Sequence, residues 1–378
     1  MTSQGVVGPG REPLGVAGPG RGPHGVPMAI ALTPMLAARY RPRDLARIRT
    51  AAPGARLVTM SIEGQADGPL DDVEVLLRGF LSAEAFDRIL ARAPRLTWVH
   101  SASAGVERVL TVAGRDRGLV VTNARGVFSQ PIAEYVLMMM LAVSRRLPQL
   151  LELQRERTWQ PLEGTELRDV TVGIVGFGSI GQAVATLASA FGCRVLATRR
   201  RPEASIGSDQ ETEPAPADTM GFGPSDDPDL TGLVSRGTVE RVMGPEALPE
   251  LLAESDFIVL AAPLTTATVG MIDEAALAAV KPGAWLINVA RGRLIDERAL
   301  LRALREGPLG GAVLDAFREE PLSAASPFYD LPNVIVTPHT SWSSGRVVDR
   351  SIALFCDNLR RFANATPLLN VVDPSIGY

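Results

Sequence analysis

The sequence contains few of the residues from which metal sites and disulfides are built. It has two cysteines, Cys193 and Cys356, which are far apart and outside any C-x-x-C pair. This excludes a disulfide framework and a cysteine metal motif, and it favours a reducing, cytoplasmic location. Three histidines occur, His24, His100 and His339. Any histidine chemistry must come from this short set, and no metal site is expected.

Long apolar runs and an excess of basic charge are lacking as well. The run VLMMMLAV at 136–143 falls far short of the roughly 20 residues that span a bilayer, and we interpret it as a buried helix. The N-terminus has no apolar core with basic flanks, so no secretory signal is expected. A net charge of −4 offers no basic footprint for nucleic acid. We therefore expect neither a membrane nor a nucleic-acid partner.

Two segments have the composition of disordered chain. Residues 1–27 repeat the unit GVxGPGR, and such a Gly/Pro-rich tail cannot bury enough apolar surface to become ordered. His24 lies there and is interpreted as a solvated residue. Residues 203–235 are acidic and contain no Lys or Arg. This insertion predicts a flexible surface excursion, either a solvated loop or a lid.

The rest of the 378-residue chain alternates β-type runs with helical patterns, which predicts an α/β protein of two domains. The β-type runs are 29–32, 57–60, 73–77, 96–100, 119–122, 170–175, 257–261, 285–289, 311–314 and 334–336. Helical patterns lie at 83–92, 105–115, 132–146, 148–158, 245–253, 273–280, 296–305 and 352–363. Repeated βα units of this kind imply a doubly wound parallel sheet, the Rossmann arrangement.

A glycine-rich turn follows the β-type run 170–175. Gly176, Gly178 and Gly181 form G-x-G-x-x-G where a helix begins, and the helix start includes Ser179 and Ile180. The three glycines suit a tight turn, close approach of the backbone to a pyrophosphate, and close packing of helix on strand. The helix N-terminus supplies N–H groups for that anion. This pattern predicts a dinucleotide cofactor.

The next strand ends in Thr198-Arg199-Arg200-Arg201, where an acidic residue would bind the ribose 2′-hydroxyl of NAD. Arg199 stands at the position of the acid, and Arg200 could serve equally. Arginine there favours the 2′-phosphate of NADP, with NAD as the alternative. The alternative reading of the run is a merely solvated group of arginines.

Reactive side chains follow three strand-like runs in succession: Arg291 after 285–289, Asp315 after 311–314, and His339 after 334–336. Ligands of open α/β sheets bind beyond the carboxyl ends of the strands. A guanidinium can grip a carboxylate, and an imidazole can exchange a proton near neutral pH. A buried carboxylate beside it would orient the imidazole and favour its charged form. His100 is interpreted as a packed core histidine, with a second catalytic group as the alternative.

These residues lie in motifs that resemble the D-isomer-specific 2-hydroxyacid dehydrogenases, with a glyoxylate/hydroxypyruvate reductase of the NADP type as the nearest likeness. The resemblance runs from about residue 70 to the C-terminus. Its motifs are SAGVE at 103–107, GVFSQPIAEYVLMMMLA at 126–142, GFGSIG at 176–181, INVARGRLIDERAL at 287–300, AVLDAFREEP at 312–321 and TPHTSW at 337–342.

The resemblance implies a role for each candidate residue. Arg291 would bind the carboxylate of a 2-oxo acid, His339 would donate a proton to its carbonyl oxygen, and Glu320 would be the partner of His339. Asp315 would meet the nicotinamide carboxamide. Two further groups complete the implied set, the substrate loop Ser103, Ala104 and Gly105, and the cofactor-lining segment Ala262, Pro263 and Leu264.

The resemblance also implies the arrangement of domains. A flavodoxin-like substrate domain would comprise residues 28–129 and 341–378, and a cofactor domain residues 130–340. The expected activity is reduction of a 2-oxo acid to a D-2-hydroxy acid with NADP or NAD, in a homodimer joined through residues 131–160. The alternatives are a nucleotide-sensing regulator of the same fold and a phosphite-type dehydrogenase.

Overall fold

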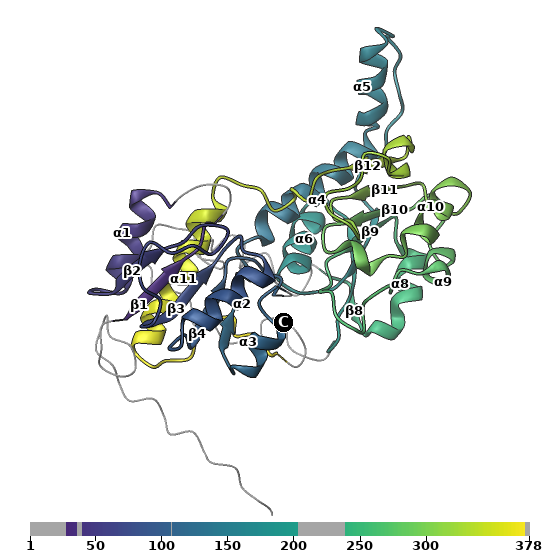
Figure 1. The fold of residues 1–378 in the computed structure, drawn as a ribbon. Coiled ribbons are helices and arrows are strands. Elements are labelled where there is room, and N and C mark those ends of the chain that lie inside the picture. The colour runs from purple at the N-terminus through teal and green to yellow at the C-terminus, as the bar shows by residue number, and fades with distance from the viewer. Residues whose placement is uncertain (1–27, 36–39, 107, 203–238, 375–378) are drawn as a thin grey trace, which may run out of the picture. The chain divides into compact units, whose positions relative to one another are not determined.

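The computed structural model describes residues 28–35, 40–106, 108–202 and 239–374 (Figure 1). The predictions for the tail 1–27, for His24 and for the insertion 203–235 lie outside the described residues. Within the described ranges, no helix has the length and apolar character that crossing a bilayer requires.

The chain divides into two compact units. Unit 1 contains the described residues up to Asn123 together with Ser351–Pro374, and unit 2 contains Ala124–Arg350. The crossing points thus lie after 123 and 350, whereas the sequence predicted them after 129 and 340. One reason is that the Arg350 guanidinium donates to the carbonyl of Val127 at 3.2 Å, which ties both residues into unit 2.

Unit 1 is built on a five-stranded parallel sheet. Its strands are β1 (Ala29–Leu32), β2 (Arg56–Thr59), β3 (Val73–Arg78), β4 (Trp98–Ser101) and β5 (Val120–Thr122), in the order β2-β1-β3-β4-β5. That order is the flavodoxin-like one. Every residue of β1, β3 and β4 is buried, as expected for strands covered on both faces.

Among its described residues, unit 1 contains α1 (Pro42–Ala51), α2 (Ala83–Arg92), α3 (Val112–Asp116) and the part of α11 (Val347–Ala363) that begins at Ser351. Trp98, fully buried on β4, stacks on Phe362 at 5.2 Å between ring centroids and lies 5.6 Å from Phe355. The C-terminal helix therefore completes a core whose strands come from the first third of the chain.

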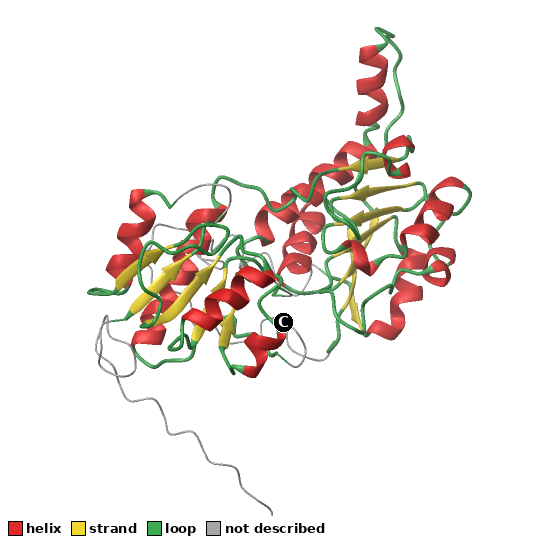
Figure 2. Ribbon diagram, in the orientation of Figure 1, coloured by secondary structure: helices red, strands yellow, loops and turns green. Residues whose placement is uncertain are grey.

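Unit 2 contains a seven-stranded parallel sheet (Figure 2). Its strands are β6 (Thr171–Val175), β7 (Arg194–Thr198), β8 (Arg241–Met243), β9 (Phe257–Leu260), β10 (Trp285–Asn288), β11 (Gly311–Leu314) and β12 (Val334–Val336). The order β12-β11-β10-β9-β6-β7-β8 is the doubly wound order with one further strand. The strand order reverses between β6 and β9, which makes this junction the switch point.

Helices cover both faces of the unit 2 sheet. One face packs on α8 (Leu248–Glu254), α9 (Glu274–Ala278) and α10 (Glu297–Arg305), the other on α4 (Ser129–Ser144) and α6 (Ser179–Ala190). Successive strand residues alternate between the two cores: Ile258 faces the first and Val259 the second. The other elements of the described part of unit 2 are α5 (Leu147–Arg155) and the 3-10 helices η1 (Pro245–Ala247), η2 (Gly292–Leu294) and η3 (Pro327–Asp330).

The structure confirms the predicted α/β class and most of the predicted elements, and it corrects one helix. The pattern at 105–115 gives a helix only from Val112, because Thr111 accepts a hydrogen bond from the Gly114 N–H and caps the helix there. Val106, Val109 and Leu110 lie in the core of unit 1 on an irregular segment instead. Their apolar spacing imitates a helical stripe.

Candidate active site

The glycine turn leaves β6 with a backbone that requires glycine. Gly176 has φ +101, and its N–H and that of Phe177 both donate to the carbonyl of Thr198 on β7, at 3.1 and 3.0 Å. A Cβ added at Gly176 would lie 2.5 Å from the backbone nitrogen of Ala262. The turn therefore places the end of β6 against the segment that follows β9, across the switch point.

The start of α6 is open to an anion. Gly178 is the N-cap residue and no side chain caps the helix, so the N–H groups of its first turn have no intrahelical acceptor. A Cβ at Gly178 would meet nothing within 4 Å, whereas one at Gly181 would lie 2.4 Å from the carbonyl oxygen of Gly176. Close packing at one glycine and open space at another fit a pyrophosphate bound at Ser179, Ile180 and Gly181.

The segment after β9 lies on the other side of the switch point. Ala262 is buried, and the Thr268 hydroxyl donates to the carbonyl of Pro263 at 2.7 Å, which fixes the loop that contains Leu264. The residues present at this crevice thus fit a dinucleotide. Beyond β7, the Arg199 N–H donates to the carbonyl of Met243 on the edge strand β8. Arg199 is half-buried and Arg200 is exposed.

Arg291 follows β10 on a turn organised by Asn288. The Asn288 amide is fully buried; it donates to the carbonyl of Arg291 at 3.1 Å and accepts from the Ala290 N–H. The Arg291 guanidinium is half-buried and donates to the carbonyl of Ala290 at 2.8 Å. Asn288 escaped the sequence analysis, although a polar residue inside the apolar run LINVA could have indicated it.

His339 and Glu320 are joined by a hydrogen bond. His339 Nδ1 lies 2.9 Å from Glu320 Oε2 and 3.0 Å from Oε1, and Oε1 also accepts the Phe317 N–H. The side chains are 37% and 38% exposed, so the carboxylate that contacts the imidazole is half-exposed, whereas the strand-end carboxylate Asp315 is buried. Because Nδ1 is bound to Glu320, Nε2 is the nitrogen available to a ligand.

The side chain of Asp315 holds the loop that carries His339. Asp315 is 1% exposed; Oδ1 accepts from the Thr337 hydroxyl and the Thr340 N–H, and Oδ2 accepts from the Ser341 N–H at 2.9 Å. A carboxylate has about four acceptor sites, so one more donor can be accommodated. Because β10, β11 and β12 are adjacent and parallel, Arg291, Asp315 and His339 share one edge of the sheet.

Comparison with known proteins agrees with this geometry. The family model described as "D-isomer specific 2-hydroxyacid dehydrogenase, NAD binding domain" matches residues 137–220 and 233–341. The chain belongs to this family. It is an NAD(P)-dependent oxidoreductase of the 2-hydroxyacid dehydrogenase type, and the resemblance inferred from the motifs is confirmed.

Relatives and solved structures of the family cover most of the chain. A glyoxylate reductase of Thermococcus gammatolerans is 35% identical over 306 residues, which are 78% of this chain and 80% of that protein. A D-isomer specific 2-hydroxyacid dehydrogenase from Xanthobacter autotrophicus, solved with NADPH and MES, has a TM-score of 0.75 and 29% identity, covering 93% of this chain and 99% of that one. The NADPH-dependent glyoxylate/hydroxypyruvate reductase of Sinorhizobium meliloti, solved with NADP and sulfate, has a TM-score of 0.72 and 28% identity, covering 93% and 100%.

The loop expected to bind substrate in this dehydrogenase lies in unit 1, after β4. The Ser103 hydroxyl donates to the carbonyl of Gly105 at 2.7 Å and contacts the Ser101 hydroxyl at 2.9 Å. The Asn123 amide donates to the carbonyl of Ala104 at 2.9 Å. These bonds give the loop a defined backbone, and its role as a substrate loop stays a prediction.

His100 of the dehydrogenase is packed in the core of unit 1, as the sequence analysis expected. Its side chain is fully buried and Nδ1 lies 2.8 Å from the Thr122 hydroxyl, which also accepts from Trp98 Nε1. Burial lowers the pKa of His100 to about 3. Nε2 has no hydrogen-bond partner in the part of the chain that the structure describes, so only one ring nitrogen is satisfied.

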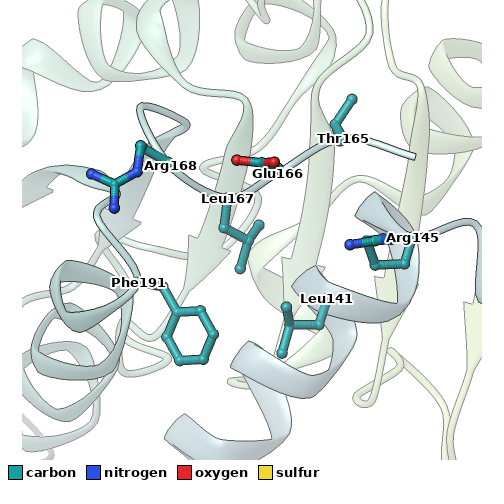
Figure 3. A pocket seen from close by; sticks show the side chains of 7 residues that line it. All are labelled: Leu141, Arg145, Thr165, Glu166, Leu167, Arg168 and Phe191. Carbon is teal, nitrogen blue, oxygen red and sulfur yellow. The ribbon is translucent and has the colours of Figure 1, made fainter. Parts of the chain in front are cut away.

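A cavity of about 270 Å³ lies elsewhere in unit 2 (Figure 3). It is lined by Leu141, Arg145, Thr165, Glu166, Leu167, Arg168 and Phe191. Residues 165–168 precede β6 and Phe191 precedes β7, so the cavity opens at the amino edge of the sheet. It is therefore distinct from the edge that carries Arg291 and His339. Among the described residues, no cluster of His, Cys, Asp and Glu could hold a metal ion.

Proposed function

We propose that this dehydrogenase reduces a small 2-oxo acid to the D-2-hydroxy acid, with His339 as general acid, Glu320 as its partner and Arg291 as the carboxylate-binding group. The observation that carries the proposal is the 2.9 Å contact between His339 Nδ1 and Glu320, on the same sheet edge as Arg291. One contact orients the imidazole, and the neighbouring guanidinium supplies the charge that attracts the acid.

The proposed mechanism assigns one step to each group. Arg291 binds the carboxylate and orients the carbonyl, since a guanidinium matches two carboxylate oxygens. A reduced nicotinamide, when bound, supplies the hydride. His339 Nε2 gives its proton to the carbonyl oxygen as negative charge develops there. Glu320 holds the imidazole ring in place through its contact with Nδ1, so that Nε2 faces the substrate.

Arginine at the end of β7 supports NADP as the preferred cofactor. Arg199 and Arg200 follow Thr198 directly. An acidic residue at this place would repel a 2′-phosphate, whereas an arginine can bind it. Two relatives were solved with NADPH and NADP, which supports the same choice for this chain. Glyoxylate and hydroxypyruvate are the proposed substrates, because two of the relatives are reductases of these acids.

Oxidation of NADPH and NADH with a panel of substrates tests the activity. The panel contains glyoxylate, hydroxypyruvate, pyruvate and bulkier 2-oxo acids, with phosphite and NADP⁺ as a separate arm. We expect turnover with a small 2-oxo acid and a fall of about 10³-fold or more in His339→Ala. Arg291→Ala should raise the KM for the acid, while Arg293→Ala, an exposed arginine two residues on, should not.

The outcomes separate the alternatives. Absence of turnover with every 2-oxo acid refutes the proposal. Binding of NADPH without any turnover would instead indicate a nucleotide-sensing regulator, and reduction of NADP⁺ by phosphite a phosphite-type dehydrogenase.

A charge change at the end of β7 tests the cofactor. The double variant Arg199→Ala/Arg200→Ala should raise the KM for NADPH at least about tenfold and leave the KM for NADH within about twofold. Faster turnover of the wild type with NADH than with NADPH would contradict the role of these arginines.

We further propose a homodimer joined through α4 and α5. Helix α5 has no buried residue, and Figure 1 shows it standing away from the sheet of unit 2. Leu147, Leu150 and Leu151 are 45%, 38% and 43% exposed, and Trp159 is fully exposed. Apolar surface of this extent usually marks an interface. Sedimentation should show a dimer that Leu150→Glu/Trp159→Glu converts to monomer, and a monomeric wild type would refute the proposal.

A further inference from the structure

His339 lies at a point where the backbone is conformationally unusual. Its φ of +50 is in the left-handed region, which residues with a Cβ seldom occupy. The Trp342 indole donates to the carbonyl of His339 at 2.7 Å, and the His339 N–H donates to the carbonyl of Thr337 at 3.0 Å. The direction of the imidazole therefore depends on how firmly this turn is held.

Asp315 holds the turn on both sides of His339. Its Oδ1 accepts from the Thr337 hydroxyl at 2.6 Å and from the Thr340 N–H at 2.8 Å, and Oδ2 accepts from Ser341. The bond to Thr337 is the one made by a side chain that can rotate, because the other two donors are backbone groups. Rotation of the Thr337 hydroxyl would break its bond to Asp315 and free the part of the turn that precedes His339.

Tyr135 on α4 fixes that hydroxyl. Its OH lies 2.6 Å from Thr337 Oγ1, across 202 residues of sequence. Thr337 has one hydroxyl proton and gives it to Asp315, so Tyr135 is the donor in the second bond. Burial, and after it the charge of Asp315, raise the pKa of Tyr135 to about 12, so its hydroxyl keeps the proton that it donates.

We propose that Tyr135 is a positioning residue for His339, which acts through Thr337 and Asp315 to fix the left-handed turn. Tyr135 is 8% exposed and belongs to the core that α4 forms with α6 and the sheet, so the donor is anchored in the core of unit 2. The sequence analysis assigned no role to Tyr135. The expected effect of Tyr135 on turnover rests on the proposed function, whereas its effect on the position of the His339 ring does not.

Steady-state kinetics test the catalytic consequence. Tyr135→Phe should lower kcat about tenfold while the KM for the 2-oxo acid and the affinity for NADPH stay within about twofold, because the Nε2 direction changes and the binding groups do not. Thr337→Val should match it, and Thr337→Ser should retain most of the activity. The double variant Tyr135→Phe/Thr337→Val should be no slower than either single variant, since both break one chain of bonds. The matched control is Tyr329→Phe, whose side chain is 53% exposed.

Nitrogen-15 NMR of labelled histidine tests the geometric consequence without turnover. The chain has three histidines, and His339→Ala assigns the signal of interest. Tyr135→Phe and Thr337→Val should shift or broaden the His339 ring signals and leave those of His100 unchanged. Unchanged His339 signals would overturn the inference, as would an unaltered kcat in an active wild type. An inactive wild type would refute the proposed function and leave the NMR result decisive for Tyr135.

Discussion

The buried histidine of unit 1 predicts acid sensitivity of a known sign. His100 has its pKa lowered from 6.5 to about 3 by burial, so the folded protein does not take up the proton that the unfolded chain binds. Its contribution to stability is therefore complete above pH 6.5 and is lost as the pH falls from 6.5 towards 3. Substitution by asparagine, His100→Asn, removes the titration while keeping a polar group near Thr122.

The magnitude follows from the two pKa values. Each pH unit between them corresponds to about 1.4 kcal/mol, so the whole window amounts to about 5 kcal/mol, and the part between pH 7.5 and 5 to about 2 kcal/mol. Groups that titrate alike in both proteins cancel in the comparison. We expect the wild type to lose about 2 kcal/mol more than His100→Asn over that interval.

Urea unfolding at pH 7.5 and pH 5 measures this difference. Tryptophan fluorescence follows both units: Trp98 lies in unit 1 with its ring 6.3 Å from that of His100, and Trp159, Trp285 and Trp342 lie in unit 2. The absolute stability of the variant does not affect the test, since only the change of its unfolding free energy with pH is compared with that of the wild type. Equal losses in the two proteins would show that His100 is protonated in the folded state, and the reasoning from burial would fail.

Two further predictions concern packing and thiol chemistry. A Cβ at Gly292 would lie 1.9 Å from the backbone carbon of Phe317, so Gly292→Ala should cost about 2 kcal/mol or more in thermal unfolding, whereas Gly345→Ala, with open space around it, should be tolerated. Equal melting temperatures would contradict this close approach. Burial raises the pKa of both Cys193 and Cys356 to about 11, so neither should be alkylated by iodoacetamide at pH 8 within the time that urea-unfolded protein reacts fully. Mass spectrometry measures the labelling, and rapid alkylation of either cysteine in the folded chain would contradict this prediction.

The predictable parts of this fold are those with strong local patterns. The strands Gly311–Leu314 and Val334–Val336 occur at the predicted bounds, because short apolar runs next to turn residues leave little choice. The edge strand Arg241–Met243 was not predicted, since it is short, half-buried and begins with a charged residue. This strand pairs with β7, and that pairing depends on tertiary contacts that a local sequence pattern does not show.

The candidate site divides along the same line. Arg291, Asp315 and His339 could be found because each follows a strand, and the parallel sheet brings strand ends to one edge. The bond from Tyr135 to Thr337 could not, because helix α4 looks apolar and its partner is 202 residues away. The exposure of Glu320 was also beyond prediction, since its environment depends on how the loop after β11 folds back.

The interruption of unit 1 by unit 2 imposes an order on folding during synthesis. The whole sheet of unit 2 lies between residues 171 and 336, so it can form before α11 is synthesised. Unit 1 must wait, because Phe355 and Phe362 cover Trp98 and Val371 bridges to Thr122 at the sheet edge. Until then the ring of Trp98 lacks its contacts with Phe355 and Phe362. A nascent chain that stalls before α11 would carry a finished cofactor unit and an unfinished partner.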